Sequence, residues 1–266
     1  MSKLHAQTQI DELTEPGNRR RRLGRSVFLL PSLFTVGNIF CGYYALLSAM
    51  YGNYGNAAYA IGVAIVLDSL DGLIARLTNS TSGFGLQLDS LADVISFGIA
   101  PAVLALFWGL SAADQRMAWI ATFTFTICGA MRLARFNVQA EKLKHFVGLP
   151  IPAGGGAIAA IVHFFGEPVH GRVGSNMMLA CVFLLALLMV STIRYYSLKH
   201  LTLGKKSHLT ILVLALLVAL AFFISRPTLL ALAVAYVISG PAARIYGGRR
   251  KKPGDEGTLA DSTQHP

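Results

Sequence analysis

The sequence predicts an all-α membrane protein, a polytopic bundle of about eight transmembrane helices. Hydrophobic residues make up 54% of the chain and charged residues only 14%, and the mean hydropathy is +0.54. This composition argues against an ordinary soluble domain. The apolar residues come in eight runs, most of them near the roughly 20 residues that a helix needs to cross the hydrocarbon core. Lys and Arg are distributed unevenly over the connecting segments, which is typical of a membrane topology.

The first predicted element, residues 1–26, is a polar cytosolic tail with the basic run RRRRLGR. It is not a secretory signal peptide, because the apolar run after it is too long and lacks a convincing cleavage site. The predicted spans follow in order at 27–50, 57–77, 86–110, 115–136, 150–166, 174–196, 207–224 and 228–246. The fifth is short and rich in glycine, and the orientation of the later spans depends on it. We expect residues 247–266 to form a disordered cytosolic tail.

The basic residues predict the orientation of these spans. With the N-terminus in the cytosol, 20 of the 23 Lys and Arg residues fall on the cytosolic side, and only Arg116, Arg172 and Arg226 fall on the other. Both termini are therefore predicted to face the cytosol, in a bacterial-type inner membrane. The net charge of +10 does not call for a nucleic-acid partner, because the cations are scattered through short loops between apolar runs.

Four aspartates interrupt the second and third apolar runs. Asp68, Asp71, Asp89 and Asp93 are the only ones of the 13 acidic residues that lie inside the long hydrophobic runs. Ionisable groups at membrane depth usually mark a functional site. The members of each pair are three or four residues apart, so each pair shares a helix face. The segment between the pairs, TNSTSGFG, favours a turn, which predicts a helical hairpin with carboxylates facing each other near its cytosolic tip.

Carboxylates gathered in this way predict a metal site. Four of them in a low-dielectric pocket cannot all stay ionised without cations. Ligation by oxygen alone, with no Cys or His nearby, favours Mg²⁺ or Mn²⁺, or else Ca²⁺, over Zn²⁺. Small residues beside the acids, Gly72, Ala75 and Gly85, would let a bulky ligand approach the helix backbone. The purely structural alternative is a set of acids that cap helices or form pairs at the membrane surface.

The spacing D-x2-D-G-x2-A-R-x8-G-x3-D-x3-D resembles the signature of the CDP-alcohol phosphatidyltransferase family. Every fixed position is matched, by Asp68, Asp71, Gly72, Ala75, Arg76, Gly85, Asp89 and Asp93. The resemblance implies a six-helix catalytic domain, 27–200, followed by two additional transmembrane helices in 201–246, and a homodimer. It also implies two bound Mg²⁺ or Mn²⁺ ions, held by the four aspartates, with Asp93 acting in addition as the general base.

Other stretches are similar to the serine-using branch of this family. Ser90 and Val94 stand where relatives that use glycerol 3-phosphate tend to have Pro and Lys. RLARFN (Arg132–Asn137), GLPIPAGGG (Gly148–Gly156) and the Gly-Asn pair of the first span agree with the same branch, although Ser32 replaces the usual Asn there. The resemblance implies transfer of the phosphatidyl group from CDP-diacylglycerol to the hydroxyl of L-serine, giving phosphatidylserine and CMP.

The same resemblance suggests which residues contact the substrates. Those expected at the nucleotide and its phosphates are Gly72, Ala75, Arg76, Ser82, Gly85 and Asn38. Arg132 and Arg135 share a helix face and could hold the carboxylate of serine or the phosphates of the donor. The alternatives are an interhelical hydrogen bond for Asn38 and a basic helix end for the two arginines. GLPIPAGGG could either line a cavity or permit close helix packing.

Two other functions remain as alternatives. The acceptor could be a different small alcohol, such as a polyol phosphate or an aminoalcohol. The chain could instead be a cation transporter that uses the aspartates as an ion relay. A transporter normally places such acids near the bilayer midplane along a crossing path, whereas these aspartates cluster at one end of their predicted spans.

Overall fold

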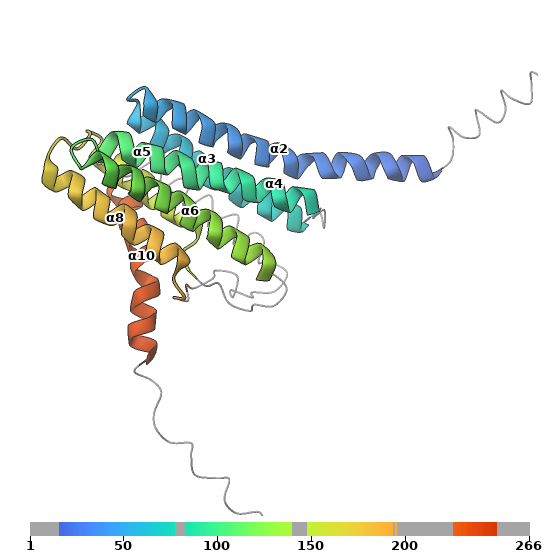
Figure 1. The fold of residues 1–266 in the computed structure, drawn as a ribbon. Coiled ribbons are helices and arrows are strands. Elements are labelled where there is room, and N and C mark those ends of the chain that lie inside the picture. The colour runs from blue at the N-terminus through green and yellow to red at the C-terminus, as the bar shows by residue number, and fades with distance from the viewer. Residues whose placement is uncertain (1–15, 78–82, 140–147, 194, 196–225, 249–266) are drawn as a thin grey trace, which may run out of the picture.

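The computed structural model of the chain describes residues 16–77, 83–139, 148–193, 195 and 226–248, and every element in this part is helical. The elements are α2 (Pro16–Met50), α3 (Tyr54–Leu77), α4 (Gly83–Asp93), the π-helix η1 (Val94–Ile99), α5 (Ala100–Gly109), α6 (Gln115–Gln139), α7 (Ile151–Phe165), α8 (Arg172–Val190) and α10 (Arg226–Gly248). Because α4, η1 and α5 run on without a break, they form one rod, and Figure 1 shows the rods gathered in a bundle. The predicted all-α fold is confirmed.

Five helical segments in the described part are long and apolar enough to cross a membrane. They are Leu33–Met50, Gly83–Gly109, Gln115–Val138, Arg172–Val190 and Arg226–Arg244. The apolar helix α7 is shorter, with 15 residues. Helix α3 has 24 residues and carries two of the aspartates. The chain is therefore a polytopic helical membrane protein. Helices lie in seven of the eight predicted runs, and the remaining run, 207–224, lies outside the described residues, so the eight-span topology stays a prediction.

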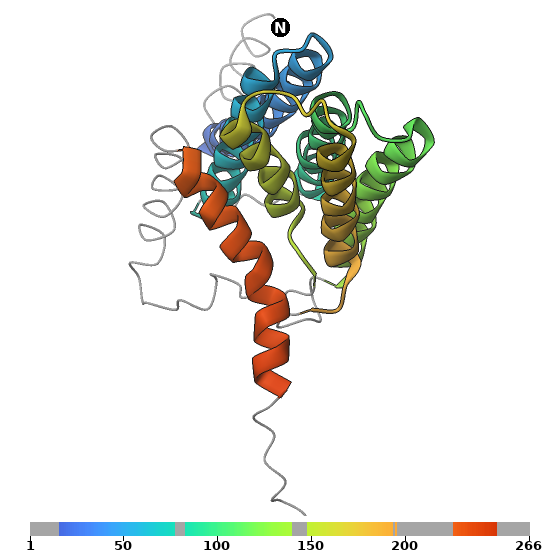
Figure 2. The ribbon, with the colours of Figure 1, turned by 90° about the vertical axis from the view of Figure 1, so that its left-hand side faces the viewer.

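Helix α2 begins at Pro16, inside the segment that we predicted as a polar tail. Hydropathy marks only the apolar part of a helix, whereas Arg is a good helix former and allows the helix to continue into the basic run. Figure 1 shows the N-terminal part of α2 extending well beyond the other helices. Figure 2 shows that α10 also leaves the bundle at its C-terminal end.

The helices pack closely because small residues line their contacts. Helix α2 packs mainly on α3, α6 on α8, and α7 on both α3 and α10. The contact between α2 and α3 is built from fully buried alanines, such as Ala45 and Ala49 on α2 and Ala57 on α3. Larger buried side chains, Trp108 and Phe125 among them, fill the space between α5, α6 and their neighbours.

The glycines of the GLPIPAGGG stretch serve this close packing. Gly148 has a φ of +84°, a conformation that L-residues with a side chain rarely adopt. A Cβ added at Gly155 would lie 2.8 Å from the backbone carbonyl oxygen of Phe97 in η1. A Cβ added at Gly154 would lie 2.1 Å from the terminal methyl carbon of Met189. The contacts therefore support the packing interpretation of this stretch.

The π-helix η1 begins immediately after Asp93, and α2 holds it in place. Ser96 in η1 is completely buried, and its hydroxyl donates a hydrogen bond to the backbone carbonyl of Asn38 over 2.8 Å. A Cβ added at Gly42 would lie 2.4 Å from the Ser96 oxygen and 2.7 Å from the Ser96 Cα. Single π-helical turns inside α-helices are frequent at functional sites. The contact between Gly42 and Ser96 thus sets the position of the segment that presents Asp93.

Replacing Gly42 with Ala should destabilise the protein by about 1–3 kcal/mol, because the added methyl group must push α2 away from the η1 backbone. Gly55→Ala is the matched control, since no atom outside the local helix lies within 4 Å of a Cβ at that position. The unfolding temperature of both variants is measured in detergent, as the temperature at which monodisperse protein is lost. Equal unfolding temperatures would contradict the close contact.

Candidate active site

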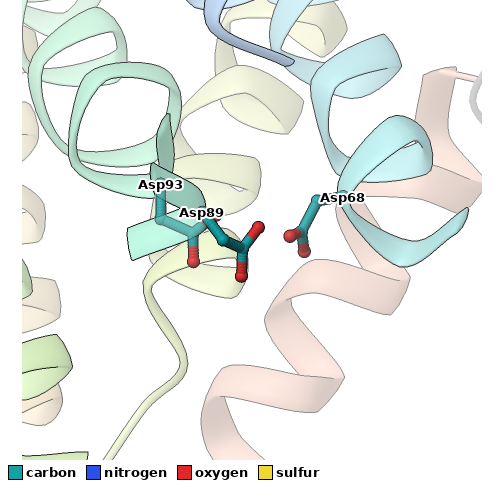
Figure 3. A group of neighbouring side chains, drawn as sticks. All are labelled: Asp68, Asp89 and Asp93. Atoms are coloured by element: carbon teal, nitrogen blue, oxygen red, sulfur yellow. The ribbon is translucent and has the colours of Figure 1, made fainter. Parts of the chain in front are cut away.

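Three aspartates gather between α3 and α4. Asp68, Asp89 and Asp93 each offer a carboxylate oxygen, and these oxygens lie within 4.8 Å of one another. Figure 3 shows Asp68 on one helix facing the other two across the gap. Asp93 is buried, with 8% of its surface exposed, and the other two are half-buried. Carboxylates this close repel each other, and hard divalent cations such as Mg²⁺ or Mn²⁺ prefer such a set of oxygen ligands.

The local sequence explains this geometry. Helix α3 ends at Leu77 and α4 begins at Gly83, so the acids of α3 and those of α4 lie close to the connection between the two helices. Asp89 and Asp93 are one turn apart on α4, which directs both side chains to the same side. The predicted helical hairpin and the predicted cluster of carboxylates thus agree with the structure for these three residues.

Asp71, the fourth predicted ligand, lies outside this group of three. One of its carboxylate oxygens accepts a hydrogen bond from the Thr35 hydroxyl on α2. The other, Oδ1, is buried and has no hydrogen-bond partner among the described residues. An unpaired buried carboxylate oxygen costs free energy, and this oxygen is available to a cation. The expectation of two facing carboxylate pairs is therefore met only in part, and a role for Asp71 in metal binding stays a prediction.

Arg132 on α6 brings a buried positive charge to the same region. Arg132 is 7% exposed, and its Nε has no hydrogen-bond partner in the described part of the structure. The guanidinium interacts electrostatically with Asp93. Arg135 follows three residues later and is half-buried. A buried guanidinium close to the most deeply buried carboxylate of the cluster can hold an anionic ligand beside it.

A hydrogen bond ties α6 to α4 next to the acidic cluster. The side-chain nitrogen of Asn137 donates to the hydroxyl of Ser90 over 2.9 Å. Ser90 directly follows Asp89, and Asn137 ends the RLARFN stretch that includes Arg132. Two stretches that the sequence singled out separately are thus in direct contact, which fixes the spacing between the carboxylates of α4 and the arginines of α6.

Asn38 on α2 is almost completely buried, with 1% exposed, and neither polar atom of its side chain has a hydrogen-bond partner among the described residues. The side chain makes no interhelical hydrogen bond there, so the alternative of a contact with a bound ligand is favoured. Gly72 and Gly85 are half-buried on α3 and α4. The side chains of Ala75 and Arg76, and all of Ser82, lie outside what the structure describes.

Comparisons with known proteins agree with this site. Residues 28–193 match the family model for CDP-alcohol phosphatidyltransferases. A CDP-diacylglycerol–serine O-phosphatidyltransferase of Helicobacter pylori is 37% identical over 196 residues, which are 72% of this chain and 82% of that protein. The protein of the same name from Bacillus subtilis is 36% identical over 166 residues, 62% of this chain and 89% of that protein. An archaetidylserine synthase of Methanothermobacter thermautotrophicus is 36% identical over 173 residues, 64% of this chain and 70% of that protein.

The matched region contains all four aspartates and both arginines of the site. It covers more than half of the chain, and it favours a phospholipid-synthesising transferase over the cation transporter. The acidic cluster between α3 and α4 is the part of the molecule that fits this chemistry, since it can hold a divalent metal ion. The chain belongs to the CDP-alcohol phosphatidyltransferase family.

Proposed function

We propose that the protein transfers the phosphatidyl group of CDP-diacylglycerol to the hydroxyl of L-serine, giving phosphatidylserine and CMP. The observation that carries the proposal is the group of three aspartates together with a buried arginine, Arg132, that interacts electrostatically with Asp93. This arrangement can serve a negatively charged donor and an acceptor that bears a carboxylate. Relatives in three organisms are named for products or acceptors that contain serine.

Asp68, Asp89 and Asp93, with Asp71 beside them, would hold one or two Mg²⁺ or Mn²⁺ ions, which neutralise the diphosphate and stabilise the CMP leaving group. In this reaction, Asp93 acts as the general base. It takes the proton of the serine hydroxyl while that oxygen forms a bond to the phosphorus that bears the diacylglycerol. The bond from this phosphorus to the oxygen of CMP breaks, and CMP leaves with the electron pair.

The remaining residues position the two substrates. Arg132 and Arg135 bind the carboxylate of serine by charge-assisted hydrogen bonds. The nucleotide and its phosphates are assigned to residues of α2 and of the α3–α4 hairpin, namely Asn38, Gly72, Ala75, Arg76, Ser82 and Gly85. Asn38 has the clearest support among them, because its buried side chain has two polar atoms in need of a partner.

We also propose where the enzyme is located in the cell. The bundle exposes many large apolar side chains, such as Phe40, Trp119 and Leu187, which the acyl chains of a bilayer would cover. We propose an inner-membrane location with both termini and the active site facing the cytosol, where CMP is released. We also propose a homodimer, as the family resemblance implies.

The activity is tested with purified protein and CDP-diacylglycerol in detergent micelles. CMP release is followed with L-serine, glycerol 3-phosphate, inositol phosphate or a neutral aminoalcohol, each with Mg²⁺, Mn²⁺ or a chelator. We expect release that requires both serine and a divalent metal. Release with another alcohol but not with serine would contradict the acceptor, and release that persists in the chelator would contradict the metal.

A further inference from the structure

Helix α10 lies outside residues 28–193, the region of the family match, yet it is docked firmly on the bundle. Near its N-terminal end, Leu229 is buried against Ala160 of α7. Further along, Tyr195 packs flat against α10, since a Cβ added at Gly240 would lie 2.4 Å from the Tyr195 ring. The Tyr195 hydroxyl also donates a hydrogen bond to the backbone carbonyl of Val237 over 3.2 Å. Figure 2 shows α10 running along the bundle before it continues beyond it.

Tyr236 lies between these two contacts and faces the bundle. It is one turn before Gly240, and its ring centroid lies 5.9 Å from that of Tyr195, with the planes tilted by 31°. Tyr195 is only 4% exposed, so this neighbour is fixed in the core. The ring contact with Tyr195 therefore limits where the half-buried side chain of Tyr236 can go.

Arg132 is the charged group that Tyr236 approaches. Its guanidinium interacts electrostatically with the Tyr236 hydroxyl and with Asp93. Arg132 is more than nine-tenths buried, and its Nε is without a hydrogen-bond partner among the described residues. A buried guanidinium that is not fully hydrogen-bonded costs free energy, and an anionic ligand would remove that cost. Arg132 on α6 thus indicates a place for an anion near the Tyr236 hydroxyl and Asp93.

We propose that Tyr236 is an acceptor-binding residue, which donates its hydroxyl to the carboxylate of the amino-acid acceptor that Arg132 also holds. The inference rests on the proposed function and deepens it, because it assigns part of the acceptor subsite to the C-terminal helix. Arg132 and Tyr236 both supply N–H or O–H donors, and a carboxylate accepts several such bonds at once. The hydroxyl-bearing carbon and the carboxylate of serine are attached to the same Cα, so an acceptor held there can present its hydroxyl to Asp93.

Tyr236→Phe tests the inference, because it removes the donor and keeps the ring that packs on Tyr195. Loss of one hydrogen bond to a charged group should raise the KM for serine by about tenfold. The kcat and the KM for CDP-diacylglycerol should stay within about twofold of the wild type. Ser239→Ala is the matched control, since it removes a hydroxyl of the same helix whose one hydrogen bond among the described residues goes to the backbone carbonyl of Tyr236. Tyr236→Gln, which restores a donor, should recover part of the affinity for serine.

The result that would overturn the inference is a KM for serine that is unchanged in Tyr236→Phe. A parallel fall in kcat and in the affinities for both substrates, with a lower unfolding temperature, would also overturn it, because that pattern marks a structural role. The wild type is assayed first with the panel of alcohols, which tests the proposed function by itself. If the wild type prefers another alcohol, the variants are compared with that alcohol. If Tyr236→Phe then raises the KM only for acceptors with an anionic group, the role of Tyr236 in acceptor binding is supported. If the KM does not rise for any acceptor, that role is rejected.

Discussion

Asp93→Asn should lower the rate of serine-dependent CMP release by about 10²–10⁴-fold, the usual cost of losing a general base. The amide has nearly the same shape as the carboxylate, so we expect the fold and most of the metal binding to persist. It cannot take the proton from the serine hydroxyl. The kcat with saturating serine and CDP-diacylglycerol measures the effect, and Mn²⁺ binding to the same variant shows whether the metal site is intact.

Asp114→Asn provides the matched control for this substitution. Asp114 precedes α6, and its carboxylate accepts a hydrogen bond from the backbone N–H of Met117, a capping role that Asn fills as well. Its turnover should equal that of the wild type. Near-normal turnover of Asp93→Asn, with the metal bound, would remove Asp93 from the role of base.

Asp68→Ala and Asp71→Ala should abolish activity through loss of the metal. Removal of a direct ligand should weaken Mn²⁺ binding by more than the roughly 10–100-fold that the loss of an outer-shell partner costs. Titration of the detergent-solubilised variants with Mn²⁺ measures the affinity, and CMP release in metal-replete buffer measures the activity. Glu167→Ala, at an exposed acid just after α7, should change neither quantity.

The Asp71→Ala variant also tests which aspartates belong to the metal site. Asp71 accepts a hydrogen bond from Thr35 and lies outside the group of three, but its unpaired buried oxygen and its electrostatic interaction with Asp89 connect it to the metal site. Full activity of Asp71→Ala with excess metal would limit the metal site to the group of Asp68, Asp89 and Asp93. The same result for Asp68→Ala would contradict the metal site as a whole.

The fold class and the core of the site could be predicted because local features determine them. Long apolar runs form helices in a membrane wherever they occur, since only a helix satisfies its own backbone hydrogen bonds there. The spacing of three and four residues places Asp68 and Asp89 on defined helix faces, and in the structure these faces of α3 and α4 bring the carboxylates together. Helix boundaries were less predictable. The start of α2 at Pro16 was not predicted, because hydropathy does not detect a helix that continues into a run of basic residues.

Contacts between helices could not be predicted in the same way. Periodicity tells which face of α3 bears Asp71, but only the position of α2 decides that Thr35 is its partner. The π-helix η1 after Asp93 is joined to α2 by Ser96, whose hydroxyl donates a hydrogen bond to the backbone carbonyl of Asn38, 58 positions earlier in the chain. Tyr236 lies in a helix without any recognisable motif, and no sequence signal connects it with Arg132.

The residues alone were enough to identify a helical membrane protein of the CDP-alcohol phosphatidyltransferase family with a group of acids on two neighbouring helices. Helix packing was needed to show that Asp68, Asp89 and Asp93 meet. It was also needed to show that the buried Arg132 interacts electrostatically with Asp93 and with Tyr236 of α10. The forces involved differ in range. Burial and helix periodicity act between residues near in the chain, whereas a site is completed by side chains that packing brings together from distant helices.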